Sequence, residues 1–189
     1  MGIKTRGGGV ILYLKNSLSA IIREDLIEPD FTECIWCEVI FEKSKTLLGV
    51  CYRPPDSLKN NDEALFKLLN KASKEKYLIM GDFNFASLNW SRASTLVDSH
   101  PFLKCINDNF LIQCVEENTR GNNMLDLIFT TEENMVENLV VGEPFGSSDH
   151  QIISWNFVRC KLKSCEEHVN LNYFKVDYEQ MRQDAKVIN

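Results

Sequence analysis

The chain of 189 residues has no apolar run that approaches the roughly 20 residues a helix needs to span a bilayer. Its opening stretch, MGIKTRGGG, lacks the apolar segment of a secretory signal. The cysteines number seven, an odd count without a secretion signal, which favours free thiols in a reducing compartment. We therefore expect an intracellular protein that does not engage membranes.

The cysteine pattern also gives little support for a zinc site. Cys34 and Cys37 form a CxxC, but no second CxxC or histidine pair follows at the spacing of zinc ligands. The pair lies inside the apolar run CIWCEVIF. We interpret both residues as buried thiols of a strand.

Basic residues are not in excess, since 21 lysines and arginines face 27 acidic residues, for a net charge of −6. A general DNA-binding module gains affinity by neutralising phosphates and should be basic. The charge therefore argues against such a module. It is compatible with an enzyme that meets phosphate through a metal ion, because the carboxylates that hold the cation add negative charge.

Hydrophobic patterning predicts many strands, few helices and no regular βαβ alternation, which indicates two packed sheets with helices outside them. The expected strands cover Gly7–Lys15, Ser19–Arg23, Glu33–Phe41, Thr46–Tyr52, Tyr77–Met80, Leu125–Phe129, Asn138–Val141 and Ile152–Phe157. Apolar positions at helical spacing predict helices around Leu65–Ala72 and Phe102–Phe110, and a looser one at Asp177–Lys186.

Polar segments follow or begin several of these strands, where catalytic side chains are commonly mounted. They are Tyr52-Arg53-Pro54-Pro55, Gly81-Asp82-Phe83-Asn84, Asn123-Met124-Leu125-Asp126 and Ser148-Asp149-His150. Each also has a structural interpretation: Asp82 and Asn84 fit an Asx turn, and Asp149-His150 fits a polar turn. Asp126 is harder to explain in this way, because a carboxylate within LDLIF needs a partner.

Together these segments supply the residue types that phosphodiester cleavage requires. The reaction needs a cation on the phosphate oxygens, a base for water, and donors for the developing charge. Mg²⁺ prefers a few carboxylates and its own waters. A histidine held by a buried carboxylate serves as base or donor, and Asn or Tyr side chains donate without competing for the metal.

The order YRPP, GDFN, N-x-L-D-L-I and SDH resembles the endonuclease/exonuclease/phosphatase superfamily, the fold of apurinic-site endonucleases and pancreatic-type deoxyribonuclease. The stretches RGGGVILYLK, DEALFKLL, GDFNFASLNW, TRGNNMLDLIFT and ENLVVGEP extend the likeness to the endonuclease domain of vertebrate LINE-type, non-LTR retrotransposons. It covers roughly Arg6 to Phe157. The segment NYFKVDYEQMR resembles the stretch that leads toward reverse transcriptase in such elements, and no YxDD motif follows it.

The resemblance implies an α/β (α+β) fold, a four-layer sandwich of two mixed sheets flanked by helices, over residues 1–157, with 158–189 as a polar linker. It implies DNA nicking with Mg²⁺ or Mn²⁺, DNA as the partner, no small-molecule cofactor and a possible nuclear location. By the resemblance, Asp149 would hold the metal, and His150, oriented by Asp126, would face the phosphate. Asp82 would act on the attacking water or on the leaving oxygen, and Asn84 and Tyr52 would donate hydrogen bonds to the phosphate. Arg53 would contact DNA or form a salt bridge.

In the family, a strand bearing an asparagine and a strand bearing the principal metal-binding glutamate precede the RGGG segment, which here starts at Arg6. The resemblance thus leads us to expect an N-terminally incomplete domain, weak metal binding and little or no cleavage. Three alternatives stay open: a working nuclease completed by another chain or known only in part, a domesticated non-catalytic interaction module, and a phosphatase of the same superfamily.

Overall fold

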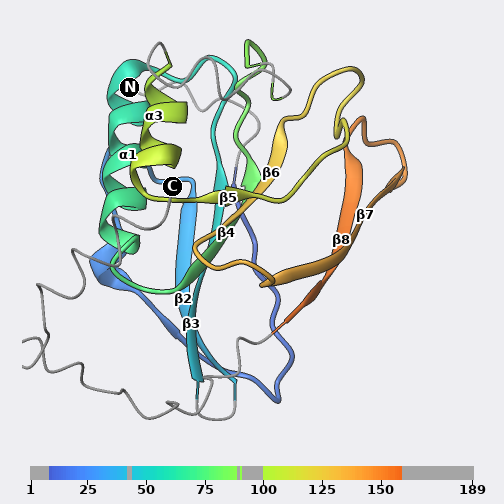
Figure 1. Ribbon diagram of the computed structural model, residues 1–189. Helices are drawn as coiled ribbons and strands as arrows, with labels where there is room; N and C mark the ends of the chain where they lie inside the picture. Colours follow the sequence, from blue (N-terminus) through green and yellow to red (C-terminus); the bar gives the residue numbers. More distant parts are fainter. Residues whose placement is uncertain (1–8, 42–43, 89, 91–99, 159–189) are drawn as a thin grey trace, which may run out of the picture. The chain divides into compact units, whose positions relative to one another are not determined.

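The computed structural model describes residues 9–41, 44–88, 90 and 100–158, whose strands form one six-stranded and one two-stranded sheet (Figure 1). The larger sheet contains, in spatial order, β1 (Ser19–Ile22), β2 (Cys34–Phe41), β3 (Ser44–Tyr52), β4 (Tyr77–Asp82), β6 (Asp126–Thr130) and β5 (Ile112–Gln113). The smaller sheet is the antiparallel pair of β7 (Val136–Pro144) and β8 (Gln151–Phe157). Within the larger sheet only β3 and β4 pair in parallel.

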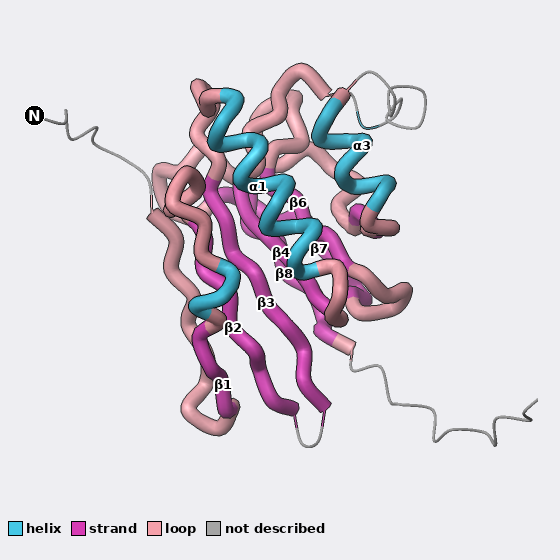
Figure 2. Tube along the Cα trace, turned by 90° about the vertical axis from the view of Figure 1, so that its left-hand side faces the viewer, coloured by secondary structure: helices cyan, strands magenta, loops and turns pink. Residues whose placement is uncertain are grey.

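Two helices cover one face of the larger sheet (Figure 2). Helix α1 (Lys59–Ala72) buries an apolar stripe at helical spacing, made of Ala64, Leu65, Leu68, Leu69 and Ala72. Helix α3 (Pro101–Asp108) starts on a proline, which suits the first turn because the missing N–H has no helical partner there. A short 3-10 helix, η1 (Glu24–Leu26), follows β1.

The central strands are buried on both faces, which explains their nearly continuous apolar sequence. Leu47 and Leu48 point to opposite faces of β3, yet they are only 2% and 8% exposed. On the helical side, Trp36 packs against Gly49, where an added Cβ would lie 2.7 Å from the indole ring. The β7–β8 sheet lies on the other face (Figure 1), and the rings of Phe41 and Phe157 stack there at 5.1 Å.

The expected fold class is confirmed: the chain is a mixed α+β protein, and its described residues form two sheets and few helices. Some local predictions differ. Residues 9–15 form no strand, so the strand expected over Gly7–Lys15 is wrong for that part, and β4 continues through Gly81 to Asp82. The helix expected at Asp177–Lys186 lies outside the described residues. The helices that are described lie on one outer side, and none of them is long and apolar enough to cross a membrane.

Candidate functional site

Three of the polar residues singled out in the sequence lie side by side at the ends of three neighbouring strands of the larger sheet. Tyr52 ends β3 and is the register partner of Asp82 at the end of β4. Asp82 in turn is the register partner of Asp126, the first residue of β6. Register partners share a face, so parallel pairing of β3 with β4 and antiparallel pairing of β4 with β6 bring these side chains together.

Gly81 allows β4 to reach this edge. Its φ is +148°, and a Cβ built on it would lie 1.8 Å from the carbonyl oxygen of Cys51 on β3. Only glycine leaves room for so close an approach of two backbones. The residue that follows, Asp82, is thereby placed beside Tyr52.

Asp82 and Asn84 form the Asx turn that their spacing predicts. The Asp82 carboxylate accepts hydrogen bonds from the backbone N–H of Asn84 at 3.1 Å and from its side-chain amide at 2.8 Å. The same amide nitrogen donates to the Arg53 carbonyl at 2.9 Å. Asn84 has a φ of +49° and is 8% exposed. The side-chain amide expected to donate to phosphate is therefore already bonded inside the protein.

His150 and Asp126 form a hydrogen-bonded dyad. The Nδ1 atom of His150 lies 2.9 Å from Oδ2 of Asp126. Its Nε2 atom lies 3.9 Å from Oδ2 of Asp82 and 4.0 Å from Oδ1 of Asp149. Because Nδ1 is engaged by Asp126, Nε2 is the ring nitrogen left facing the other two carboxylates.

Thr119, which the sequence did not suggest, holds the dyad in place. Its buried hydroxyl accepts hydrogen bonds from the backbone N–H groups of Leu125 at 3.0 Å and Asp126 at 2.9 Å. Its carbonyl accepts from the N–H of Gln151 at 2.8 Å. One residue thus fixes the start of β6, which carries Asp126, and the start of β8, which follows His150.

Arg120 is a second residue that sequence reasoning missed. Its Nε donates to Asp149 at 2.7 Å, and this hydrogen bond holds the pKa of Asp149 below its ordinary value. A tight turn at Gly121, with φ +58°, and a bridge between Arg120 and Asn123 shape this loop. The only available signal was the basic residue within TRGNN, a few residues before the LDLI segment.

Asp82, Asp126 and His150 could hold a metal ion, because one ligand atom from each lies within 4.8 Å of the others. The donor set combines two carboxylates, which hard divalent cations prefer, with an imidazole nitrogen. Asp149, to which the resemblance assigns the metal, adjoins this group through His150. Its side chain is largely exposed and is already paired with Arg120.

Arg53 forms a salt bridge inside the protein. Its guanidinium donates to both carboxylate oxygens of Asp62, at 2.7 and 3.0 Å, and to the carbonyl of Asn84 at 3.1 Å. It also lies over the ring of Phe85 and is 7% exposed. The expected salt bridge is thus present, and the guanidinium supports the turn that carries Asn84. The expected contact of Arg53 with DNA stays a prediction.

The environment of Asp82 makes this carboxyl hard to ionise. Burial, reinforced by the negative charge of Asp126, raises its pKa to about 6, against the lowering effect of His150 and the Asn84 hydrogen bonds. An acid with a pKa near neutrality can accept a proton at one step and return it at another. A carboxyl whose pKa is raised in this way is a candidate for acid–base chemistry.

This raised pKa predicts a stability that falls between about pH 4 and pH 6. The unfolded chain loses the Asp82 proton near the ordinary value of 3.8, whereas the folded chain keeps it until about 6. Ionisation in the folded state then costs on the order of 1–3 kcal/mol. We expect Asp82→Asn to remove this slope and to be more stable than wild type at pH 7. Urea unfolding across this pH range, without metal, tests it; parallel profiles for the two proteins would contradict it.

Comparison with known proteins gives one family and one fold. A family model described as endonuclease-reverse transcriptase matches residues 46–154, more than half of the chain. The solved endonuclease domain of TRAS1, a telomere-specific non-LTR retrotransposon, is 18% identical with a TM-score of 0.58, covering 75% of this chain and 67% of that one. At that identity the likeness shows the fold.

A second similar structure is an endonuclease/exonuclease/phosphatase family protein from Leptotrichia buccalis C-1013-b. It is 14% identical with a TM-score of 0.46, and the match covers 76% of this chain and 62% of that one. No curated protein matches the sequence.

Proposed function

The chain belongs to the endonuclease-reverse transcriptase family, and from this premise we propose that it is a retrotransposon-derived endonuclease that nicks DNA with the help of a divalent metal ion. The observation that carries the proposal is the dyad of His150 and Asp126. Its free Nε2 atom lies about equally far from Asp82 and Asp149, at 3.9 and 4.0 Å. Such a group of carboxylates around a held histidine suits hydrolysis of a phosphodiester.

Each residue has a defined part in this proposal. Asp82, with a pKa of about 6, is ionised at neutral pH and accepts the proton of the attacking water. The water oxygen bonds to phosphorus as the bond to the leaving sugar oxygen breaks, and the leaving oxygen takes a proton from solvent. His150 in its protonated form donates from Nε2 to a phosphate oxygen, while Asp126 fixes the ring through Nδ1. A Mg²⁺ or Mn²⁺ ion held at the cluster of Asp82, Asp126 and His150 would offset negative charge on the phosphate.

In this proposal Tyr52 assists at the rim of the site. It is half-buried, and its backbone neighbours Asp82 in the register of β3 and β4. The phenol donates a hydrogen bond to a phosphate oxygen without competing for the cation. Asn84 takes part by fixing the Asp82 carboxylate, since its amide already donates to that group at 2.8 Å.

Metal binding by the described ligands is weak in this proposal. Asp149 is paired with Arg120 at 2.7 Å, and Asp126 is hydrogen-bonded to His150 at 2.9 Å. A cation therefore has to displace or share existing partners, and Mg²⁺ gives up its waters reluctantly. Cleavage is correspondingly slow.

The direct test of the proposed function is nicking of supercoiled plasmid DNA. The purified chain is expected to convert it slowly to the open circular form with Mg²⁺ or Mn²⁺, and a chelator should stop the reaction. A small phosphate monoester is expected not to be hydrolysed under the same conditions. Plasmid left intact at every metal concentration would overturn the proposal, and metal-dependent release of phosphate from the monoester would favour a phosphatase.

Replacing Arg120 by alanine should tighten metal binding. The change frees Asp149 from its ion pair and removes a positive charge from the site. We expect the Kd for Mn²⁺, measured by calorimetric titration, to fall by about three- to tenfold, which corresponds to roughly 1 kcal/mol.

Arg23→Ala is the matched control for Arg120→Ala. Arg23 is also ion-paired near the surface, but its partners are Asp25 and Glu75, which lie outside the candidate site. Its removal should leave the Mn²⁺ affinity unchanged. Equal affinities for wild type and Arg120→Ala would show that Asp149 is no ligand.

A further inference from the structure

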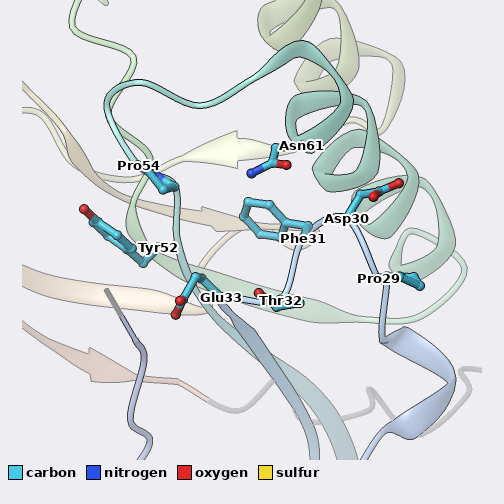
Figure 3. Close-up of a pocket in the computed structure, with 8 residues that line it drawn as sticks. All are labelled: Pro29, Asp30, Phe31, Thr32, Glu33, Tyr52, Pro54 and Asn61. Carbon is cyan, nitrogen blue, oxygen red and sulfur yellow. The ribbon is translucent and has the colours of Figure 1, made fainter. Parts of the chain in front are cut away.

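A pocket of about 250 Å³ lies beside Tyr52 at the edge of the larger sheet (Figure 3). It lies between the loop that leads into β2, the end of β3 and the start of α1. In Figure 3, Glu33 and Tyr52 lie together at one end, while Phe31 and Asn61 lie further along and Asp30 beyond them. The roles assigned above to Asp82, Asp126 and His150 make no use of this space.

The pocket adjoins the proposed site of cleavage. The carbonyl of Glu33 accepts the N–H of Tyr52 at 2.9 Å, and Tyr52 is the register partner of Asp82. Two strand spacings of about 4.8 Å therefore separate the backbone of Glu33 from that of Asp82, roughly 10 Å in all. Nucleotides of one DNA strand rise about 3.4 Å each, so the pocket lies within a few nucleotides of a phosphate held at Asp82.

The charged groups that line the pocket are both carboxylates. Glu33 and Asp30 contribute carboxylates, and no lysine or arginine is among the described residues that line it. A phosphate would be repelled, whereas N–H groups would be bound. The side chains of Glu33, Tyr52 and Asn61 are half-buried, and none has a side-chain hydrogen bond to another described residue. They are available to a ligand.

The wall of the pocket is held in a fixed conformation. Phe31 is buried, and its N–H donates to the carbonyl of Glu28 at 3.0 Å, which closes the turn before β2. The carboxylate of Glu28 is bonded to Lys71 on α1 at 2.6 Å. A pocket that is already formed loses little entropy when it binds a ligand.

We propose that this pocket binds an unpaired guanine of the DNA substrate, an inference that rests on the proposed function. The Watson–Crick edge of guanine presents two adjacent donors, N1–H and N2–H, which match the two oxygens of the Glu33 carboxylate. The flat face of the base packs against the ring of Tyr52. Thymine presents one N–H between two carbonyl groups, which the carboxylate repels. The pocket thus favours guanine over thymine next to the cleaved bond.

The test measures binding alone, in EDTA, with the His150→Ala protein, so that it is independent of cleavage. Fluorescein-labelled single-stranded pentanucleotides TTGTT, TTATT, TTCTT and TTTTT serve as probes in anisotropy titrations. We expect TTGTT to bind at least about tenfold more tightly than TTTTT, the discrimination of one good bidentate pair. The near-isosteric change Glu33→Gln should reduce this preference to less than about threefold.

Glu63→Gln is the matched control for Glu33→Gln. It removes an exposed carboxylate of α1 that pairs with Lys59 and does not line the pocket, so the preference for TTGTT should persist. Equal affinity for the four oligonucleotides, no binding to any of them, or a preference that survives Glu33→Gln in a folded protein would each overturn the inference. Plasmid nicking by the wild-type chain is scored separately, so a failure here is distinguishable from a failure of the proposed function.

Discussion

Replacing His150 by alanine is expected to reduce metal-dependent plasmid nicking by about a hundredfold to ten-thousandfold, the usual contribution of a positioned acid or base. The imidazole is the only described group that is hydrogen-bonded to Asp126 and at the same time faces Asp82 and Asp149. Alanine leaves no donor for the phosphate. Rates of conversion of supercoiled to open circular plasmid, at saturating Mn²⁺, provide the measurement.

Two further variants make this result specific. Asp126→Asn keeps the size of the side chain but removes the charge that orients the ring of His150, so we expect a smaller loss, of about tenfold to a hundredfold. Glu63→Ala changes an exposed carboxylate on α1, outside the site, and should leave the rate unchanged. Nicking at the wild-type rate by His150→Ala would remove the dyad from the mechanism.

Replacing Gly81 by alanine is expected to destabilise the fold by about 3–5 kcal/mol, or to prevent folding. The added methyl group would meet the backbone of Cys51, with the carbonyl oxygen 1.8 Å away, and a φ of +148° is itself strained for alanine. A rigid main chain cannot move aside as a flexible side chain can. Urea unfolding followed by circular dichroism measures the change.

Gly121→Ala is the matched control for Gly81→Ala. Gly121 also has a positive φ, +58°, but no atom lies within 4 Å of its added Cβ. Its replacement should therefore cost only the conformational strain, about 1–2 kcal/mol. If both variants lost the same stability, contact between β3 and β4 would not be the reason for glycine at position 81.

Sequence patterning predicted the parts of the fold that depend on local order. The apolar run around Leu47 and Leu48 correctly indicated a strand buried on both faces. The spacing of Leu65, Leu68 and Leu69 correctly indicated the buried side of α1. The strand expected before Lys15 did not form among the described residues, because an apolar run shows that a segment can pair and not whether a neighbour is present.

The candidate site was predictable only where a residue type has few structural explanations. A carboxylate inside LDLIF needs a partner, and His150 is 2.9 Å from Asp126. Thr119 and Arg120 gave no such signal, since a threonine or arginine before a turn is unremarkable until the fold brings it to Asp126 and Asp149. Arg53 was ambiguous for the same reason, because the position of Asp62 on α1 is a tertiary fact.

The dyad is divided between the two sheets, and this affects when the protein can act. Asp126 begins β6 of the larger sheet, whereas His150 immediately precedes β8 of the smaller one. The hydrogen bond from the N–H of Gln151 to the carbonyl of Thr119, at 2.8 Å, joins the start of β8 to the loop before β6. An excursion that detaches the β7–β8 pair would separate His150 from Asp126 while the larger sheet stays folded. The site would then open in an equilibrium separate from global unfolding, and amide hydrogen exchange at Gln151 would report this opening. Catalytic activity would be lost at a lower denaturant concentration than the fold of the larger sheet.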